Sequence, residues 1–156
     1  MSEAQQPTFS TEKIYVKDLS LEVPGGPQTF MQSDQPQLEI QIAHQSQRVN
    51  EVLFEVTLGV TVTAKLGDKT AFLVEVSQAG VFQIRNVAEA DLAPILGIGC
   101  PSVLFPYARE TVSDVIGRAG FPPVLLAHVN FEALFQQQHA GQPAAQPGAP
   151  RIEVAH

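Results

Sequence analysis

Strict alternation of apolar and polar side chains runs from Val52 to Ile84 and constrains the fold more than any other feature of the sequence. In the first arm every even-numbered position from Val52 to Ala64 is apolar, and the odd-numbered positions between them are mostly polar. Because successive side chains of a strand point to opposite faces, this arm has one apolar and one polar face. The pattern predicts a long β-hairpin whose turn lies at 66–69, where Gly67 can adopt a positive φ.

The second arm of the hairpin repeats this alternation. Phe72, Val74 and Val76 fall on one face of this arm. Leu73, Glu75 and Ser77 fall on the other face, which is mostly polar. Val and Thr dominate both arms and suit a pleated, half-buried surface. Ala79-Gly80 interrupts the second arm at a place where a β-bulge would fit.

Two further strands are predicted before the hairpin. The first spans 12–23 and ends at a Pro-Gly-Gly-Pro turn, and residues 1–10 before it are polar and expected to be frayed. The second is short, at 38–42, where apolar and polar residues alternate. Residues 44–50 are polar and predict a turn.

After the hairpin the period of the apolar residues changes to that of a helix. Apolar residues recur every three or four positions over 102–119 and predict a helix that ends before Phe121-Pro122-Pro123. The stretch 92–99 is short, apolar and broken by glycine, and is ambiguous between a helical turn and a loop. Asn130 is a good N-cap for a second helix, which begins at Phe131 and dissolves into the glutamines at 136–138.

The strands come first and the helices last, which predicts an α+β domain with two C-terminal helices on one face of a four-stranded antiparallel sheet. The domain spans 1–138, and the Ala, Pro, Gly and Gln-rich segment 139–156 is predicted to be a disordered tail. Within this tail 152–154 is either a short linear motif or part of a frayed end. Two helices cannot cover so continuous an apolar sheet face, and we therefore expect oligomerisation.

The overall composition excludes several classes of function. The 156 residues carry a formal net charge of −7, which argues against binding to nucleic acid. The sequence has one cysteine, so no intramolecular disulfide can form. We therefore expect the protein to lie in the cytoplasm, where the reducing environment keeps thiols free. The N-terminus lacks the profile of a signal peptide, and no apolar run approaches the ~20 residues that cross a bilayer, so we expect no membrane insertion.

No group of residues predicts catalysis. The four histidines lack metal-ligand spacing to one another or to Cys100, and Cys100 has no base partner nearby. We therefore predict that the protein is not an enzyme and needs no cofactor. Binding to a partner is the class of function that is left. Glu75 with Asp18 and Glu22 would form either an acidic patch for a basic partner or a face that only contacts solvent.

Several strings of the sequence resemble the SecB protein-export chaperones. They run from about Ile14 to Phe135 and include Val60-Thr61-Val62-Thr63-Ala64, Thr70-Ala71-Phe72-Leu73, Leu104-Phe105-Pro106-Tyr107-Ala108-Arg109-Glu110 and Val129-Asn130-Phe131. The resemblance implies a homotetramer, built as a dimer of dimers, with helices layered between two sheets. It also implies a holdase that binds unfolded precursor proteins without ATP and delivers them to the SecA translocation ATPase.

The resemblance assigns roles to particular residues. It implies SecA contacts at Asp18, Glu22, Leu73 and Glu75 on the outer sheet face, and a role in tetramer assembly for Val74, Val76 and Gln78 on the face toward the helices. It places a client groove between the second helix, the sheet and the loop that follows the first strand. The candidates for this groove are Phe30, Phe82, Phe131, Leu134 and Phe135.

Four points stay open in this comparison. The tail lacks the acidity seen in some relatives and contains Arg151, which leaves open whether it makes a second contact with SecA. For Phe82 and Leu134, core packing explains the residue equally well. Asp34 stands where many relatives carry a tryptophan, which bears on the loop's part in the groove. SecB-like proteins also include adaptor chaperones for a specific client such as an antitoxin; an extended C-terminal region would favour that function, and the short tail here does not supply one.

Overall fold

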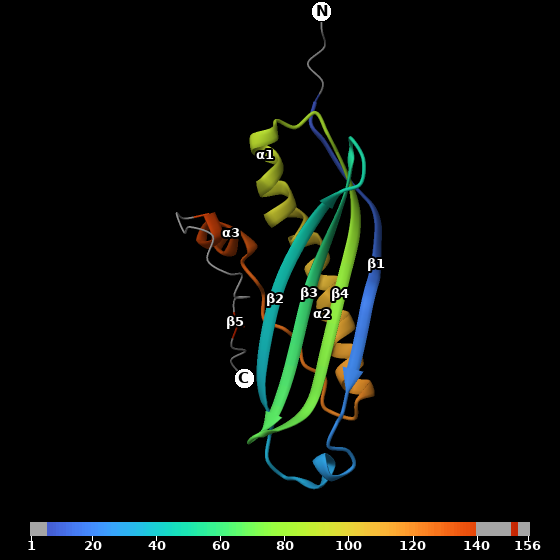
Figure 1. The fold of residues 1–156 in the computed structure, drawn as a ribbon, viewed down its shortest axis with the longest axis vertical. Helices are drawn as coiled ribbons and strands as arrows, with labels where there is room; N and C mark the ends of the chain where they lie inside the picture. The colour runs from blue at the N-terminus through green and yellow to red at the C-terminus, as the bar shows by residue number, and fades with distance from the viewer. Residues whose placement is uncertain (1–5, 140–150, 153–156) are drawn as a thin grey trace, which may run out of the picture.

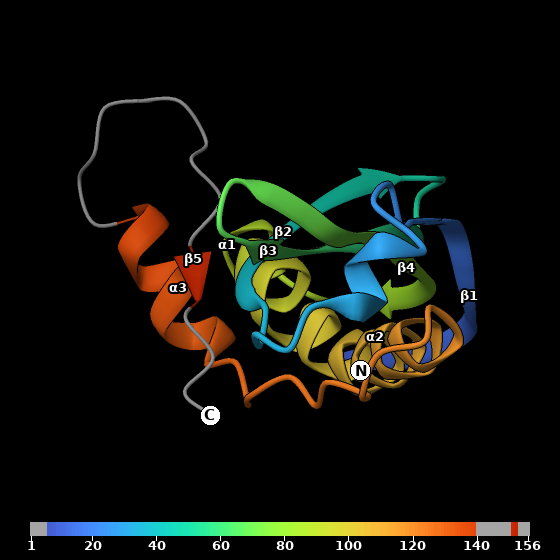
Figure 2. The same ribbon diagram turned by 90° about the horizontal axis from the view of Figure 1, so that it is seen from below.

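The computed structural model describes residues 6–139 and 151–152, which form one antiparallel sheet layered against helices (Figures 1 and 2). The strands follow the order β1-β4-β3-β2-β5 across the sheet. Their bounds are β1 Thr8–Glu22, β2 Gln37–Arg48, β3 Leu53–Leu66, β4 Lys69–Arg85 and β5 Arg151–Ile152. The helical segments are η1 Gln28–Met31, α1 Glu89–Pro94, η2 Ile95–Gly99, α2 Cys100–Arg118 and α3 Phe131–His139. The predicted α+β class is confirmed.

The predicted hairpin is formed by β3 and β4, and the strand order places it at the centre of the sheet. Val60 lies opposite Val76 and Val62 opposite Val74, and all four side chains are buried. We call their side of the sheet the inner face, because α2 covers it, and the opposite side the outer face (Figure 2). The turn uses Gly67 with a φ of +62°, a conformation that suits glycine.

The two flanking strands are longer than predicted. β1 begins at Thr8, so residues 8–10 are not frayed, because they pair with 83–85 of β4. β2 continues through the predicted turn at 44–50 as far as Arg48, since its backbone pairs with β3 up to Phe54. Both errors have one cause: main-chain pairing with a long neighbour extends a strand regardless of how polar its side chains are.

No bulge lies at Ala79-Gly80, where one was predicted. Pairing is regular there, and the register shifts of the neighbouring strand lie in β1, between Thr11 and Lys13 and between Val16 and Asp18. Gly80 instead permits a close approach of the helix. A Cβ at this position would lie 2.8 Å from the ring of Phe82 and 2.9 Å from Leu104.

The ambiguous stretch 92–99 is helical. α1, the π-helical segment η2 and α2 join into a helix that spans Glu89–Arg118 and packs along the sheet (Figure 1). By length and composition alone it could cross a membrane, contrary to the expectation that no such run exists. A core helix meets the same criteria: Leu104, Ala108, Val112 and Ile116 recur every fourth residue, and all are buried.

The second predicted helix is α3, and its N-cap is confirmed. The backbone N–H of Ala133 donates to Oδ1 of Asn130 at 3.0 Å. α3 does not end at the glutamines but continues to His139. The predicted disordered tail therefore loses its first residue to α3, and β5 lies within it; its other residues, 140–150 and 153–156, lie outside the described residues.

Candidate interaction surfaces

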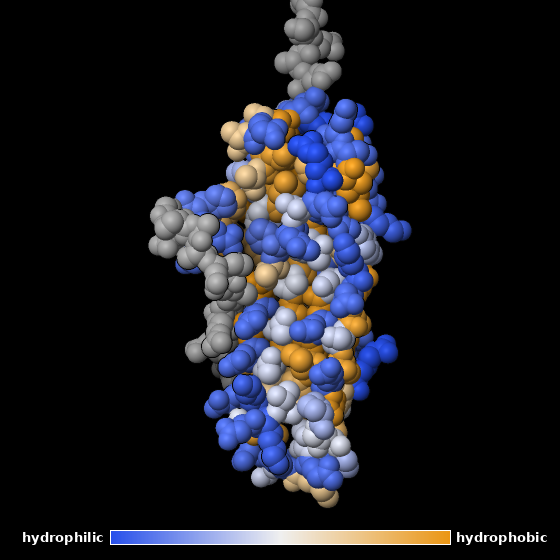
Figure 3. Space-filling model, viewed as in Figure 1, coloured by the Kyte–Doolittle hydropathy of each residue, from blue (hydrophilic) through white to orange (hydrophobic). Residues whose placement is uncertain are grey.

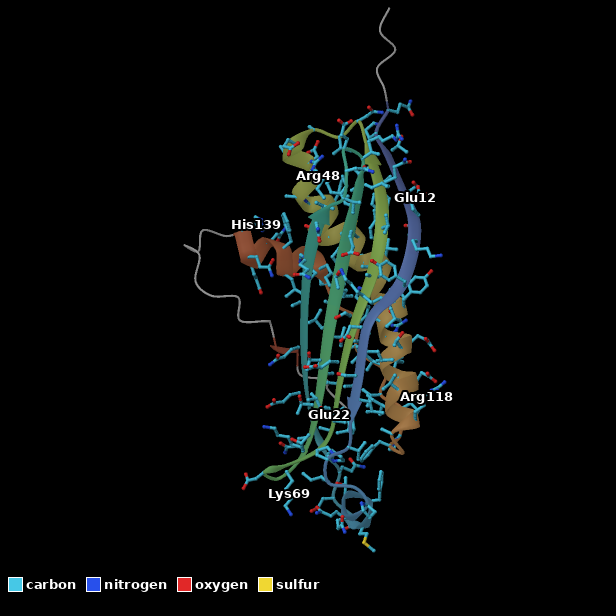
Figure 4. The ribbon with its side chains drawn as sticks, turned by 45° about the vertical axis from the view of Figure 1, so that its right-hand side comes forward. Glu12, Glu22, Arg48, Lys69, Arg118 and His139 are labelled. Atoms are coloured by element: carbon cyan, nitrogen blue, oxygen red, sulfur yellow. The ribbon has the colours of Figure 1, made fainter. Side chains whose placement is uncertain are left out.

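The predicted acidic patch comes together on the outer face at one end of β1 and β4. Glu22 lies opposite Leu73 and Ser20 opposite Glu75, so the register brings the acidic side chains of both strands to the same face. The Ser20 hydroxyl donates to Glu75 at 3.4 Å. Glu22 lies near the end of β1 (Figure 4). Asp18, Glu22 and Glu75 are exposed and make no ion pair among the described residues.

A polar cluster that the sequence analysis missed adjoins this patch on the outer face. Lys17 Nζ lies 2.6 Å from Oε1 of Glu55, and the Tyr15 hydroxyl donates to Oε2 of the same carboxylate. These hydrogen bonds, that of Lys17 first, lower the pKa of Glu55, and the same carboxylate raises the pKa of Tyr15. Lys17 is thereby engaged by Glu55, which leaves the adjacent acidic patch without this cation.

The positions predicted to affect assembly lie on the inner face. Val74, Val76 and Gln78 are all buried in the protomer. Gln78 Nε2 donates to the carbonyl oxygen of Tyr15 at 3.1 Å, while its buried Oε1 has no hydrogen-bond partner among the described residues. Their side chains are not accessible on the protomer surface, so any effect of these residues on assembly passes through the packing of the sheet.

Apolar side chains of β1 lie next to them and remain accessible. Val16 pairs with Gln78, Leu19 with Val76 and Leu21 with Val74, so all three point to the inner face. They are nevertheless 44%, 46% and 37% exposed. α2 packs mainly on β4 and β3, and these side chains of β1 stay accessible beside it. The side chains form an apolar strip, which we call the β1 strip.

The five residues predicted to line a client groove do not form one surface in the protomer. Phe30 is 51% exposed in η1, beyond the end of the sheet, whereas Leu134 and Phe135 lie in α3 beside β2 (Figure 1). Phe82 is fully buried and stacks on Phe9 at 5.6 Å, in agreement with the core-packing alternative. Phe131 is also buried, against Phe105.

A row of aromatic rings ties η1 to the core. Phe30 lies 5.1 Å from Phe121, which in turn lies 4.8 Å from Phe72 between ring centroids. Gly120, with a φ of +91°, ends the helix beside Phe30. Asp34 is exposed between η1 and β2. The row leaves one side of Phe30 and the neighbouring Met31 accessible.

α3 is seated on η2 through one close contact. A Cβ at Gly97 would lie 2.7 Å from the ring of Phe135, so glycine is what lets this ring approach the backbone. The same Cβ would lie 3.8 Å from His44 of β2. Burial lowers the pKa of His44. η2 thus joins α3 to the inner side of β2.

The remaining hollows and titratable groups suggest no catalytic centre. The described residues hold no group of three or more His, Cys, Asp or Glu side chains that could bind a metal ion. Burial raises the pKa of the Cys100 thiol to about 12, so this thiol stays protonated at neutral pH. A hollow of about 620 Å³ includes Arg48, Glu51, Arg85 and Glu89 in its lining but none of the predicted client residues.

The outer face differs from a uniformly solvated surface. In the view of Figure 3 apolar residues are visible between hydrophilic ones along the sheet. The accessible features of this α+β domain are therefore its sheet faces and edges, the β1 strip and the exposed ring of Phe30. Surfaces of this kind suit the binding of other polypeptides.

Comparison with known proteins gives the family. The family model described as preprotein translocase subunit SecB matches residues 2–142. The chain is 63% identical over 147 residues to the protein-export protein SecB of Chromobacterium violaceum, covering 93% of this chain and 98% of that protein. It is 51% identical to the SecB of Neisseria meningitidis over 92% of this chain and 99% of that protein. The chain belongs to the SecB family.

One solved structure supports the fold independently. A SecB-like chaperone of Mycobacterium tuberculosis, in complex with a peptide from an antitoxin, superposes with a TM-score of 0.61 and covers 78% of this chain and 90% of that one. At 20% sequence identity this likeness shows the fold alone.

Proposed function

We propose that this protein is a protein-export chaperone, a holdase that binds unfolded precursor proteins in the cytoplasm without ATP and passes them to the SecA ATPase. The observation that carries the proposal is the high identity, over nearly the full length, to relatives named protein-export protein SecB. The exposed apolar side chains of η1 and the half-buried ones of α3 support it, since such contacts accept many extended sequences.

The test is binding to one preprotein in two states. The protein is expected to bind the urea-unfolded preprotein, on dilution, with micromolar or tighter affinity and not to bind its folded mature form, because only the unfolded chain exposes apolar segments. Isothermal titration with and without ATP measures both. Equal binding to the two states would contradict the proposal.

The client surface that we propose has two parts. Phe30 and Met31 supply one at the end of the sheet, and Leu134 and Phe135 of α3 supply the other beside β2. Phe131 supports the second part from the core through its contact with Phe105. A long unfolded chain can contact both parts at once. Such bivalent contact strengthens binding even where each part alone binds weakly and selects no particular sequence.

We propose that the acidic patch of Asp18, Glu22 and Glu75, together with the adjacent Leu73, contacts SecA. Three exposed carboxylates lie in a row along the outer face, with the half-buried Leu73 at one end opposite Glu22, and such a surface suits a basic partner with an apolar contact at one side. The neighbouring Lys17 is held by Glu55 and so does not neutralise the patch.

Reversal of one charge tests this surface. Glu75→Lys is expected to weaken SecA binding about tenfold or more, because a repulsive contact replaces an attractive one, while the mass of the assembly stays unchanged. Glu51→Lys is the matched control, since Glu51 is an exposed carboxylate in the loop at the opposite end of the sheet. Dissociation of the assembly by Glu75→Lys, measured by sedimentation, would show that this face has been assigned the wrong partner.

We propose that the protein acts as a homotetramer, a dimer of dimers. The accessible β1 strip supports this, because apolar area of this kind favours association. Val74, Val76 and Gln78 lie next to the strip on the same face of the sheet. A role as an antitoxin-specific adaptor is not proposed, because the likeness to the SecB-like structure extends to the fold alone.

A further inference from the structure

Two residues near the C-terminus, Arg151 and Ile152 (β5), dock on the edge of the same sheet. β5 pairs antiparallel with β2, with Ile152 opposite Ile40 and Arg151 opposite Gln41. The sheet order places β5 outside β2, at the edge opposite β1. In Figure 1 β5 lies alongside β2, on the side where α3 projects. Eleven residues, 140–150, join α3 to β5.

The edge on which β5 docks is long and mostly open. β2 runs from Gln37 to Arg48, and β5 pairs with only two of its residues. Along the rest of this edge no strand of the described residues pairs with the main chain of β2. A row of unpaired N–H and C=O groups is a template for any extended polypeptide, and recognition through it does not depend on side chains.

The sequence of the C-terminal segment suits this docking at one place only. Ile152 and Val154 are the only β-branched residues within 139–156, and such residues favour strands. The preceding stretch carries Pro143, Pro147 and Pro150, which have no N–H to donate. Eleven residues reach at most about 40 Å when fully extended, so Arg151 and Ile152 stay within that distance of the end of α3.

We propose that β5 is a resident competitor for the β2 edge, displaced when an extended segment of a client pairs with β2. This inference rests on the proposed holdase function and adds a regulated site to it. Because β5 and a client strand require the same main-chain groups, bound β5 lowers the fraction of protein that is competent to bind. Occupancy of the edge for two-thirds to nine-tenths of the time weakens client binding about 3-fold to 10-fold.

The experiment removes the pairing capacity of β5 in the full-length chain. Arg151→Pro combined with Ile152→Pro deletes both N–H groups, and Ala144→Pro combined with Ala145→Pro adds the same two prolines outside the paired dipeptide. The probe is a fluorescein-labelled peptide of alternating apolar and Ser or Thr residues, long enough to span β2. A second probe has the same sequence with every other amide N-methylated, which removes the donors of one edge.

Fluorescence anisotropy distinguishes the outcomes. The Arg151→Pro/Ile152→Pro variant is expected to bind the first probe about 3-fold to 10-fold more tightly than the unmodified chain, while the control and the N-methylated probe show no gain. Equal affinity of that variant and the unmodified chain would overturn the proposal, as would an equal gain for the N-methylated probe. If no version of the chain binds an unfolded preprotein, the proposed function fails instead.

Discussion

The two edges of the sheet are built differently. At the β1 edge, Leu19 and Leu21 point to the inner face yet remain accessible. At the β2 edge, Ile40 and Ile42 point to the same face and are almost fully buried. η2 packs on β2 and holds α3, whereas α2 packs mainly on β4 and β3. Among the described residues the main chain is unpaired along the outer edge of β1 and along most of that of β2. The two edges therefore differ in their inner side chains, which are accessible at β1 and covered at β2.

This difference separates two kinds of binding. Uncovered apolar side chains favour a fixed partner with a matching surface, such as a second copy of the chain, because packing depends on shape. An uncovered main chain accepts extended polypeptides of many sequences. We therefore expect a fixed partner at β1, where apolar side chains are accessible beside the main chain, and a variable client at β2, where the main chain alone is open.

The largest effect is expected from breaking the β1 edge. Leu19→Asp with Leu21→Asp places two charges in the β1 strip and should raise the dissociation constant of the assembly about 100-fold or more, since four large apolar side chains are lost from each two-fold contact. Sedimentation velocity measures this loss of mass. Ser20→Asp is the control, because Ser20 lies between them on the outer face. An unchanged mass in the double variant would place the assembly contact elsewhere.

A smaller effect is expected at the seat of α3 beside β2. Gly97→Ala drives a Cβ into the ring of Phe135 and should cost about 1–3 kcal/mol of unfolding free energy and loosen α3. Hydrogen exchange of the α3 amides and urea unfolding measure both. Gly99→Ala lies in the same helical segment with nothing within 4 Å of its Cβ, and should be neutral or slightly stabilising. Equal effects of the two substitutions would mean that the Phe135 contact is unimportant.

The smallest effect concerns the link from β1 to β3 on the outer face. Lys17→Met removes the ion pair and should cost about 0.2–1 kcal/mol at pH 7. The folded-state pKa of Glu55 lies below its ordinary value, so the stabilisation is present at neutral pH and is lost as the pH falls from about 4.3 through the folded pKa.

Urea unfolding at fixed protein concentration, compared at pH 7 and in acid, checks this pH dependence. The difference between the unmodified chain and Lys17→Met should shrink in acid. Tyr15→Phe should have a smaller effect than Lys17→Met, because Lys17 contributes more to the lowered pKa of Glu55. A difference that is the same at both pH values would exclude the ion pair as the cause.

The hairpin was predictable because its information is local. Alternation within 52–84 defines two faces, and both faces are found in the structure. The same alternation placed Leu73 and Glu75 on one face and Val74 and Val76 on the other. Asn130 as the N-cap of α3 was predictable for a similar reason, since capping involves residues within one turn.

The misjudged features depend on neighbours that are distant in sequence. Polar residues 44–48 become a strand because β3 offers them partners. Gly80 marks the approach of Leu104 from a helix and not a bulge. A phenylalanine looks the same in the sequence whether it is buried like Phe82 or exposed like Phe30, because only the packing of other elements decides its accessibility.

By itself the sequence determined the α+β class, the central hairpin and the chemistry of its two faces, since alternation, turns and caps act within a few residues. Only the tertiary structure decided which apolar side chains stay accessible, that Lys17 and Glu55 meet, and that Arg151–Ile152 return to β2. Each of these depends on where α2 crosses the sheet or on pairing between distant segments. Such contacts arise from the packing of the whole chain, and no local pattern encodes them.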